Sequence, residues 1–201
     1  MFEWVTGIIE RTGYLGVAFL MFAENVFPPI PSELIMPLAG FAAARGELNV
    51  GLVVLAGSAG SLLGAWFWYE VGRRVGAERL KGWAARHGRW LTLGPEEVDR
   101  AREWFGRHGG KAVLLGRMVP AVRTLISVPA GIAGMPLGPF LAYSAIGTLV
   151  WTGLLAGAGN LLEDQYGRVS GWVNPVSNLA LAGMVLWYLY RVATFRRGQA
   201  S

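Results

Sequence analysis

The sequence contains no cysteine and only two histidines, His87 and His108. The missing thiols exclude disulfide bonds, thioether-linked haem and thiolate metal sites. Both histidines stand in a charged stretch without a metal-ligand pattern, so we expect neither a metal site nor another cofactor. The serines and histidines also form no recognisable pair of nucleophile and base, and we therefore expect a protein that is not an enzyme.

Charged side chains are scarce as well. Only 15% of the 201 residues are charged, while 53% are hydrophobic, and the mean hydropathy is +0.40. A typical soluble domain has about a quarter charged residues. Two uncharged runs, 50–69 and 171–190, match the roughly 20 residues that a helix needs to cross about 30 Å of hydrocarbon. The sequence therefore predicts an all-α integral membrane protein with a single transmembrane domain over 1–201.

The cationic residues are unevenly distributed along the chain. Ten of the 18 Lys and Arg residues lie between Arg73 and Lys111, and three arginines follow the last apolar run. Lys and Arg concentrate in the cytoplasmic loops of membrane proteins, which places an amphipathic linker, 77–111, and the C-terminus in the cytoplasm. This distribution indicates how the chain is oriented in the membrane and does not indicate a basic groove for nucleic acid, so we expect no nucleic-acid partner.

Three full membrane crossings fit this distribution. We place them at 50–69, 140–162 and 171–190. The segment between the linker and the second crossing, 112–139, must then enter from the cytoplasm and return to it. Its apolar arms are each about half a span at 1.5 Å per residue, and Pro120 and Pro129 interrupt them. We predict an inward-opening re-entrant hairpin here, and such broken segments at membrane depth typically mark a binding site.

The first third of the chain repeats this plan. Residues 14–44 form two apolar arms joined by a proline-rich turn. The turn contains Pro28, Pro29 and Pro31, each of which fixes φ and removes an N–H donor. Because 50–69 runs from outside to inside, we expect this hairpin to open outward. Phe2, Val5 and Ile9 share one face of a preceding amphipathic helix, which is interfacial or, alternatively, spanning.

The two hairpins belong to similar segments. PLAGFAAA at 37–44 resembles VPAGIAGM at 128–135, and a pair of glycines twelve residues apart follows in each half, Gly60 with Gly72 and Gly147 with Gly159. We therefore predict an inverted repeat, with 1–76 and 112–162 in opposite orientations. The spacings Gly60–Gly64 and Gly153–Gly157 also permit close helix approach, which favours internal packing and leaves a homodimer as the alternative.

Four ionisable residues mark the hairpin tips. Glu24 and Glu33 flank the first set of prolines, and Arg117 and Arg123 flank Pro120. Such groups cost several kcal/mol inside a membrane unless they are paired or hydrated, so we expect them to converge on a polar cavity. The fork of donors on arginine suits phosphate, and a protonatable carboxylate beside it can release the anion. The alternative interpretation is that Glu–Arg ion pairs only hold the hairpins together.

A family resemblance rests on these same blocks. FAENVFPPIPSE at 22–33, LAG at 38–40, WYEVGRRVG at 68–76 and GRMVPAVRTLISVPAGIAGM at 116–135 carry it. At these residues the chain resembles the DedA family, also called SNARE-associated Golgi or VTT-domain proteins. The resemblance implies a bacterial cytoplasmic-membrane protein with two re-entrant hairpins, in a family linked to proton-motive force, envelope integrity and undecaprenyl phosphate recycling.

The resemblance also implies roles for individual residues. The functional acids of the family correspond to Glu24 and Glu33, and its essential arginines to Arg117 and Arg123. Ala65 stands where some members carry an acid, so an additional proton carrier is absent from that position.

The residues and the resemblance together predict a flippase. We expect Arg117 and Arg123 to bind the phosphate of a lipid, most specifically undecaprenyl phosphate, and Glu24 and Glu33 to couple its movement to protons. Three alternatives stay open: a non-selective phospholipid scramblase, as in eukaryotic relatives, a proton-coupled exporter of small ions or drugs, and an assembly protein without transport activity.

Overall fold

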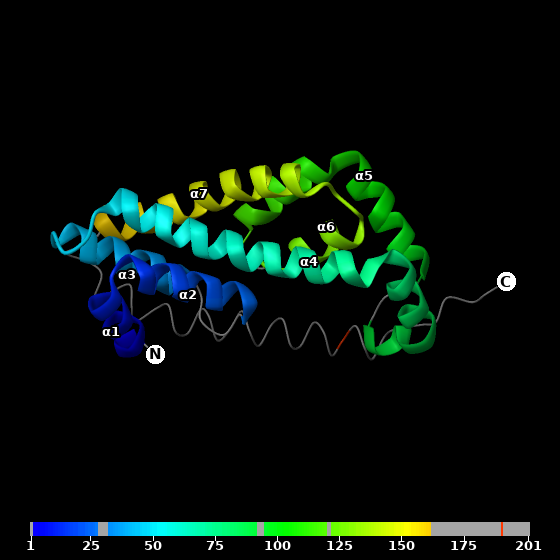
Figure 1. Cartoon of the computed structure of the whole chain (residues 1–201), viewed down its shortest axis with the longest axis horizontal. Coiled ribbons are helices and arrows are strands. Elements are labelled where there is room, and N and C mark those ends of the chain that lie inside the picture. Colours follow the sequence, from blue (N-terminus) through cyan, green and yellow to red (C-terminus); the bar gives the residue numbers. More distant parts are fainter. Residues whose placement is uncertain (1, 28–31, 92–94, 120–121, 162–189, 191–201) are drawn as a thin grey trace.

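The computed structural model describes residues 2–27, 32–91, 95–119, 122–161 and 190. Seven α-helices and no β-strand occur in this part of the chain (Figure 1). The helices are α1 Phe2–Thr12, α2 Tyr14–Val26, α3 Ser32–Ala44, α4 Val50–Leu91, α5 Pro95–Met118, α6 Ser127–Ile132 and α7 Leu137–Leu161. The prediction of an all-α protein is confirmed.

Two of the described helices are long and apolar enough to cross a membrane. They are the Val50–Gly82 part of α4 and the whole of α7, Leu137–Leu161. Both expose apolar side chains, among them Leu52, Leu55, Leu63, Phe67, Ile146, Leu149, Val150 and Leu154. Helices α2 and α3 are apolar but only 13 residues long, about 20 Å at 1.5 Å per residue, which is too short for a complete crossing.

The helix boundaries differ from the sequence prediction at several points. Helix α4 continues to Leu91 instead of ending near Tyr69, because charged residues end an apolar span without ending a helix. The sequence GPEEVDRAREWFGRHG at 94–109 predicts a surface helix that ends before Gly109, and this end is wrong, since α5 continues to Met118. The neighbouring Gly110 lies against the ring of Tyr143. The predicted third crossing at 171–190 lies outside the described residues, except for residue 190.

Helix α1 follows its predicted amphipathic pattern. Val5 and Ile9 are buried, whereas Glu10 and Arg11 on the other face are exposed. The buried face packs with α2 and α3 around Val17, Leu20 and Met36. A second core forms near the middle of α4, where the rings of Tyr69 and Phe140 stack with centroids 4.5 Å apart. The two apolar cores lie on either side of the polar residues described below.

Helices α2, α3, α5 and α6 pack against the two helices that are long and apolar enough to cross a membrane, α4 and α7. Helix α2 lies along α4 and α5 lies along α7, whereas α3 packs on α7 and α6 packs on α4 (Figure 1). Glycines make these contacts close. A Cβ atom at any of five glycines would collide with the backbone of the facing segment, in the pairs Gly60 with Ala18, Gly72 with Val128, Gly159 with Pro37, Gly40 with Ala156 and Gly131 with Tyr69. A Cβ atom at a sixth, Gly147, would collide with the side-chain Cβ of Arg117. Small residues allow backbones to approach in this way.

The two GxxxG spacings differ in their use. Gly60 and Gly64 face α2, where Cβ atoms would meet Ala18 and Asn25, so this pair serves internal packing as predicted. Gly153 and Gly157 on α7 have no described atom within 4 Å of a built Cβ. The homodimer alternative stays a prediction.

Candidate functional site

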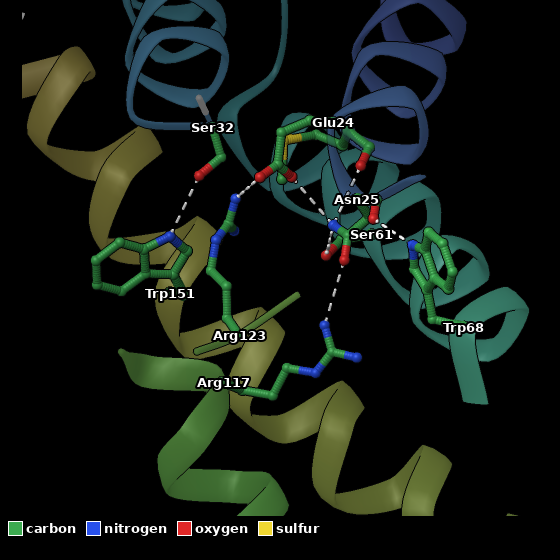
Figure 2. Close-up of polar contacts among 9 residues, drawn as sticks. Glu24, Asn25, Ser32, Ser61, Trp68, Arg117, Arg123 and Trp151 are labelled. Carbon is green, nitrogen blue, oxygen red and sulfur yellow. Dashed lines mark hydrogen bonds and ion pairs between the residues drawn. The ribbon is translucent and has the colours of Figure 1, made fainter. Parts of the chain in front are cut away.

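A cluster of buried polar side chains lies between the two apolar cores. Figure 2 shows Glu24 and Asn25 from the end of α2 facing Arg117 from the end of α5 and Arg123 from the following turn. Their exposed fractions are 4% for Glu24, 1% for Asn25, 2% for Arg117 and 4% for Arg123. Residues about a hundred positions apart in the sequence therefore meet in one interior site, as the pattern of charges predicts.

Glu24 and Arg123 form an ion pair. The Arg123 guanidinium donates a hydrogen bond through Nη2 to Glu24 Oε1, and it is the one ion pair among the described residues in which both side chains are buried. Glu24 lies in the last turn of α2, where the partial negative charge of the helix end disfavours a carboxylate. The guanidinium therefore compensates both the burial of Glu24 and its position on the helix.

Asn25 connects this ion pair to the neighbouring helices. Its Nδ2 donates to Glu24 Oε2 at 3.1 Å and to Ser61 Oγ on α4 at 2.8 Å (Figure 2). The Nε1 of Trp68 donates to the backbone oxygen of Asn25 at 2.9 Å. The sequence patterns gave no prediction of a site role for Asn25 or Trp68. An amide directly after Glu24 in an apolar run was the available signal for Asn25, whereas nothing local distinguishes Trp68 from an aromatic at the membrane boundary.

Arg117 is buried without a carboxylate partner. Its Nη2 donates to Ser127 Oγ on α6 at 2.9 Å, and its Nη1 lies 3.5 Å from Asn25 Oδ1. No described carboxylate lies within ion-pair distance, and Nε has no hydrogen-bond partner. The position in the last turn of α5 offers partial compensation, since cations are favoured at a helix C-terminus. Buried charges are otherwise paired, so this guanidinium has free capacity for an anion.

Glu33 occupies a different environment from Glu24. It is the second residue of α3, half-buried, at the helix end that favours a carboxylate. It is close enough to Glu24 for like-charge repulsion, yet it forms no ion pair with any described residue. Beside it, Trp151 on α7 donates through Nε1 to Ser32 Oγ at 3.4 Å. The structure thus brings Glu33 near the cluster without giving it a cation.

The remaining predicted site residues are the prolines. Pro129 lies in α6 and is half-buried, next to the serine that contacts Arg117. Pro28, Pro29, Pro31 and Pro120 lie outside the described residues. Within the described part of the chain, no three His, Asp or Glu side chains come close enough together to hold a metal ion.

Comparison with known protein families assigns the chain to a family. The model of the VTT domain matches residues 30–161, well over half of the chain. The chain belongs to the VTT-domain family, also known as DedA. The match covers Glu33, Arg117 and Arg123 and begins just after Glu24, which the structure nevertheless brings to Arg123. Family membership, the two long apolar helices and the bacterial relatives described next together support a bacterial membrane protein.

Several curated relatives cover nearly the whole chain. An alkaline phosphatase-like protein of Lactococcus lactis subsp. cremoris is 39% identical over 183 residues, 90% of this chain and 86% of the relative. Undecaprenyl phosphate transporter A of Staphylococcus aureus is 31% identical over 94% of each chain. Undecaprenyl phosphate transporter A of Bacillus subtilis is 28% identical over 96% of this chain and 95% of its own length. No solved structure matches the chain.

Proposed function

We propose that this VTT-domain protein moves a lipid-linked phosphate between the leaflets of the bacterial cytoplasmic membrane, with undecaprenyl phosphate as its substrate and protons as the coupling ion. One observation carries the proposal: Arg117 is a buried guanidinium with unused donors, and it lies beside an Arg123 whose carboxylate partner can be protonated. Arginine binds phosphate through several parallel donors. The names of the Staphylococcus and Bacillus relatives support the choice of lipid.

The coupling follows from competition for Arg123. Unprotonated Glu24 accepts the hydrogen bond of Arg123 and neutralises its charge. When Glu24 takes up a proton, it no longer neutralises Arg123, and both guanidiniums are available to one phosphate. Loss of the proton restores the ion pair and expels the anion. Glu33, which faces Glu24 without a cation of its own, serves as the second proton acceptor in this scheme.

The proposed architecture is an inverted repeat with two re-entrant hairpins. Helices α2 and α3 form the outward-opening hairpin, and the end of α5 with α6 forms the inward-opening one. Equivalent glycine contacts support the repeat. Gly72 on α4 lies against Val128, and its counterpart Gly159 on α7 lies against Pro37, which corresponds to Val128 in the aligned segments. The backbones of Tyr69 and Ala156, each three residues before these glycines, lie against the counterparts Gly131 and Gly40.

This arrangement brings the tips of both hairpins to one interior site. Each hairpin packs on the long helix of the other half through α3 or α6, so the site residues from α2 and α5 meet between α4 and α7. The basic linker and the C-terminus then face the cytoplasm. A ligand that enters between the hairpins keeps its hydrocarbon tail in the lipid while its phosphate reaches the arginines.

Transport in proteoliposomes tests the proposal. A fluorescent undecaprenyl phosphate analogue and a fluorescent phospholipid are followed by leaflet-resolved quenching, with and without a pH gradient, for wild type and Arg117→Ala/Arg123→Ala. We expect selective, gradient-sensitive movement of the analogue that the double variant abolishes. Equal movement of both lipids indicates a scramblase instead, and no movement by folded protein contradicts transport. Release of inorganic phosphate is measured in the same samples, because hydrolysis of the lipid contradicts a transporter.

A further inference from the structure

Three buried side-chain atoms in the described part of the chain have no hydrogen-bond partner. They are Nε of Arg117, Oγ of Ser144 and Oγ1 of Thr148. Ser144 is fully buried, and Thr148 is 3% exposed. Buried polar atoms in proteins are rarely left without a partner, because burial removes them from water, so these three require an explanation.

The helix register and one glycine contact place Ser144 and Thr148 near Arg117. On α7, Phe140 stacks on Tyr69 of α4, and Thr152 hydrogen bonds Ser58 of α4 at 2.8 Å. Ser144 and Thr148 lie between these two contacts at spacings of four residues, so they share the face of α7 that points at α4. Gly147, between them in the sequence, lies against the side-chain stem of Arg117, because a Cβ there would be 2.7 Å from Arg117 Cβ. The stem of Arg117 therefore lies against the turn of α7 that carries Ser144 and Thr148.

We infer that Ser144 and Thr148 complete the phosphate site by donating hydrogen bonds to the phosphate oxygens, together with Arg117. The Nε–H group can only donate, both hydroxyls can donate, and the guanidinium is positively charged, so the set suits an oxyanion better than a cation. Ser127, which is fully buried and accepts a hydrogen bond from Arg117 at 2.9 Å, adds a further hydroxyl beside the guanidinium. This inference rests on the proposed function, since it names further binding residues of the same site.

Isosteric variants separate ligand binding from packing. Thr148→Val and Ser144→Ala remove only hydroxyls that have no internal partner, so without ligand they unfold at the same temperature as wild type or higher. Each is expected to weaken binding of undecaprenyl phosphate in nanodiscs by about tenfold, as one lost hydrogen bond to a charged group predicts. Binding is measured by titration and by the thermal shift that the lipid produces.

Thr152→Val is the matched control, because the Thr152 hydroxyl bonds Ser58 and the backbone oxygen of Thr148. It should lower the unfolding temperature and leave the affinity unchanged. Wild-type affinity in both Thr148→Val and Ser144→Ala, or a lowered unfolding temperature without ligand, would overturn the inference while the proposed function stands. If wild type itself binds no phosphorylated lipid, the proposed function fails and this inference fails with it.

A separate observation, a cavity of about 450 Å³ beside the middle of α5, carries a second inference. Arg107, His108 and Lys111 line one side, and Met135, Pro136 and Tyr143 line the other. No acidic residue belongs to the lining, and Lys111 forms no ion pair with a described residue. Arg107 pairs at 3.4 Å with Glu103, but both side chains are exposed, and such pairs contribute little in water.

We propose that this cavity binds the phosphate group of an anionic lipid from the adjacent leaflet. The cavity lies at the point in α5 where the charged sequence gives way to apolar sequence, and close to the first residue of the apolar helix α7. Basic and apolar side chains therefore line it together. Polybasic sites at this level attract anionic headgroups. The cavity is separate from the buried site, because none of its lining residues belongs to the polar cluster around Glu24.

Lipid retention tests the cavity. Wild type, Arg107→Gln/Lys111→Gln and the control Arg102→Gln, an exposed arginine on α5 outside the cavity, are purified from vesicles of phosphatidylglycerol and phosphatidylcholine. Mass spectrometry of co-purified lipid should show phosphatidylglycerol enriched several-fold with wild type and the control, and not with the double variant. Inorganic phosphate is added as a competitor; full displacement by it assigns the cavity to a free phosphate. Equal enrichment in all three proteins overturns the proposal.

Discussion

At the scale of single residues, the Glu24–Arg123 pair is the interaction whose loss should be most costly. Glu24→Gln leaves the Arg123 guanidinium buried without a counterion, and such a change costs about 3–5 kcal/mol. We expect loss of transport and a clearly lower unfolding temperature. Glu103→Gln is the control, because Glu103 and Arg107 form an exposed pair that contributes about 0.5 kcal/mol or less.

A double-mutant cycle separates the pair from its surroundings. Glu24→Gln/Arg123→Gln removes both charges, so its loss of stability should be smaller than the sum of the two single losses. Simple additivity would show that the two side chains do not interact. Transport should be absent from the double variant, because the proposed phosphate ligand and proton acceptor are both missing even when the fold is restored.

The sequence predicted part of this site for physical reasons. Charges are so costly at membrane depth that Glu24 and Arg123 had to find a partner or water, and the structure pairs them. The same rule did not predict that Arg117 would stay without a carboxylate, because pairing depends on distances between segments that composition does not fix. Asn25 was not predicted as a site residue, because burying a neutral amide in a membrane costs less free energy than burying a charge, and its presence is therefore less informative.

At the scale of helices, close glycine contacts determine the packing. Gly40→Ala should destabilise the protein, because the added Cβ collides with the backbone of Ala156, which cannot move aside as a flexible side chain could. Gly153 lies on α7, the helix against which α3 packs, and no described atom lies within 4 Å of an added Cβ there, so Gly153→Ala should gain up to about 1 kcal/mol from better helix propensity. Thermal unfolding in detergent compares the two, and equal effects would contradict glycine-dependent packing.

The glycines also show where sequence reasoning on helices fails. A glycine near the end of a charged segment is typical of a helix C-terminus, which led to the wrong prediction for Gly109. In the structure, Gly109 approaches Met135 and Gly110 lies against Tyr143, so both are used for tertiary contact inside α5. Local patterns do not distinguish these two uses, because the facing residues are more than twenty positions away. The repeat spacing of Gly60, Gly72, Gly147 and Gly159 was informative since it compares two segments instead of interpreting one.

At the scale of the whole molecule, the inverted arrangement predicts which surfaces face each side of the membrane. The turn at 45–49, between α3 and α4, should lie outside, whereas the linker around Arg102 and the turn before α7 around Pro136 should lie inside. The chain has no cysteine, so single introduced cysteines report accessibility without background. Glu47→Cys, Arg102→Cys and Pro136→Cys place the probes at exposed positions.

Labelling of intact cells with a membrane-impermeant maleimide gives the readout. Glu47→Cys should react in intact cells, and Arg102→Cys and Pro136→Cys only after lysis. The position of Pro136 is decisive, because Arg102 and Pro136 lie on the same side only if residues 112–135 enter the membrane and return. Reaction of Pro136→Cys from outside would make that segment a complete crossing. The second hairpin would then not be re-entrant, and the opposed orientation of the two halves, on which alternating access to the arginines depends, would be lost.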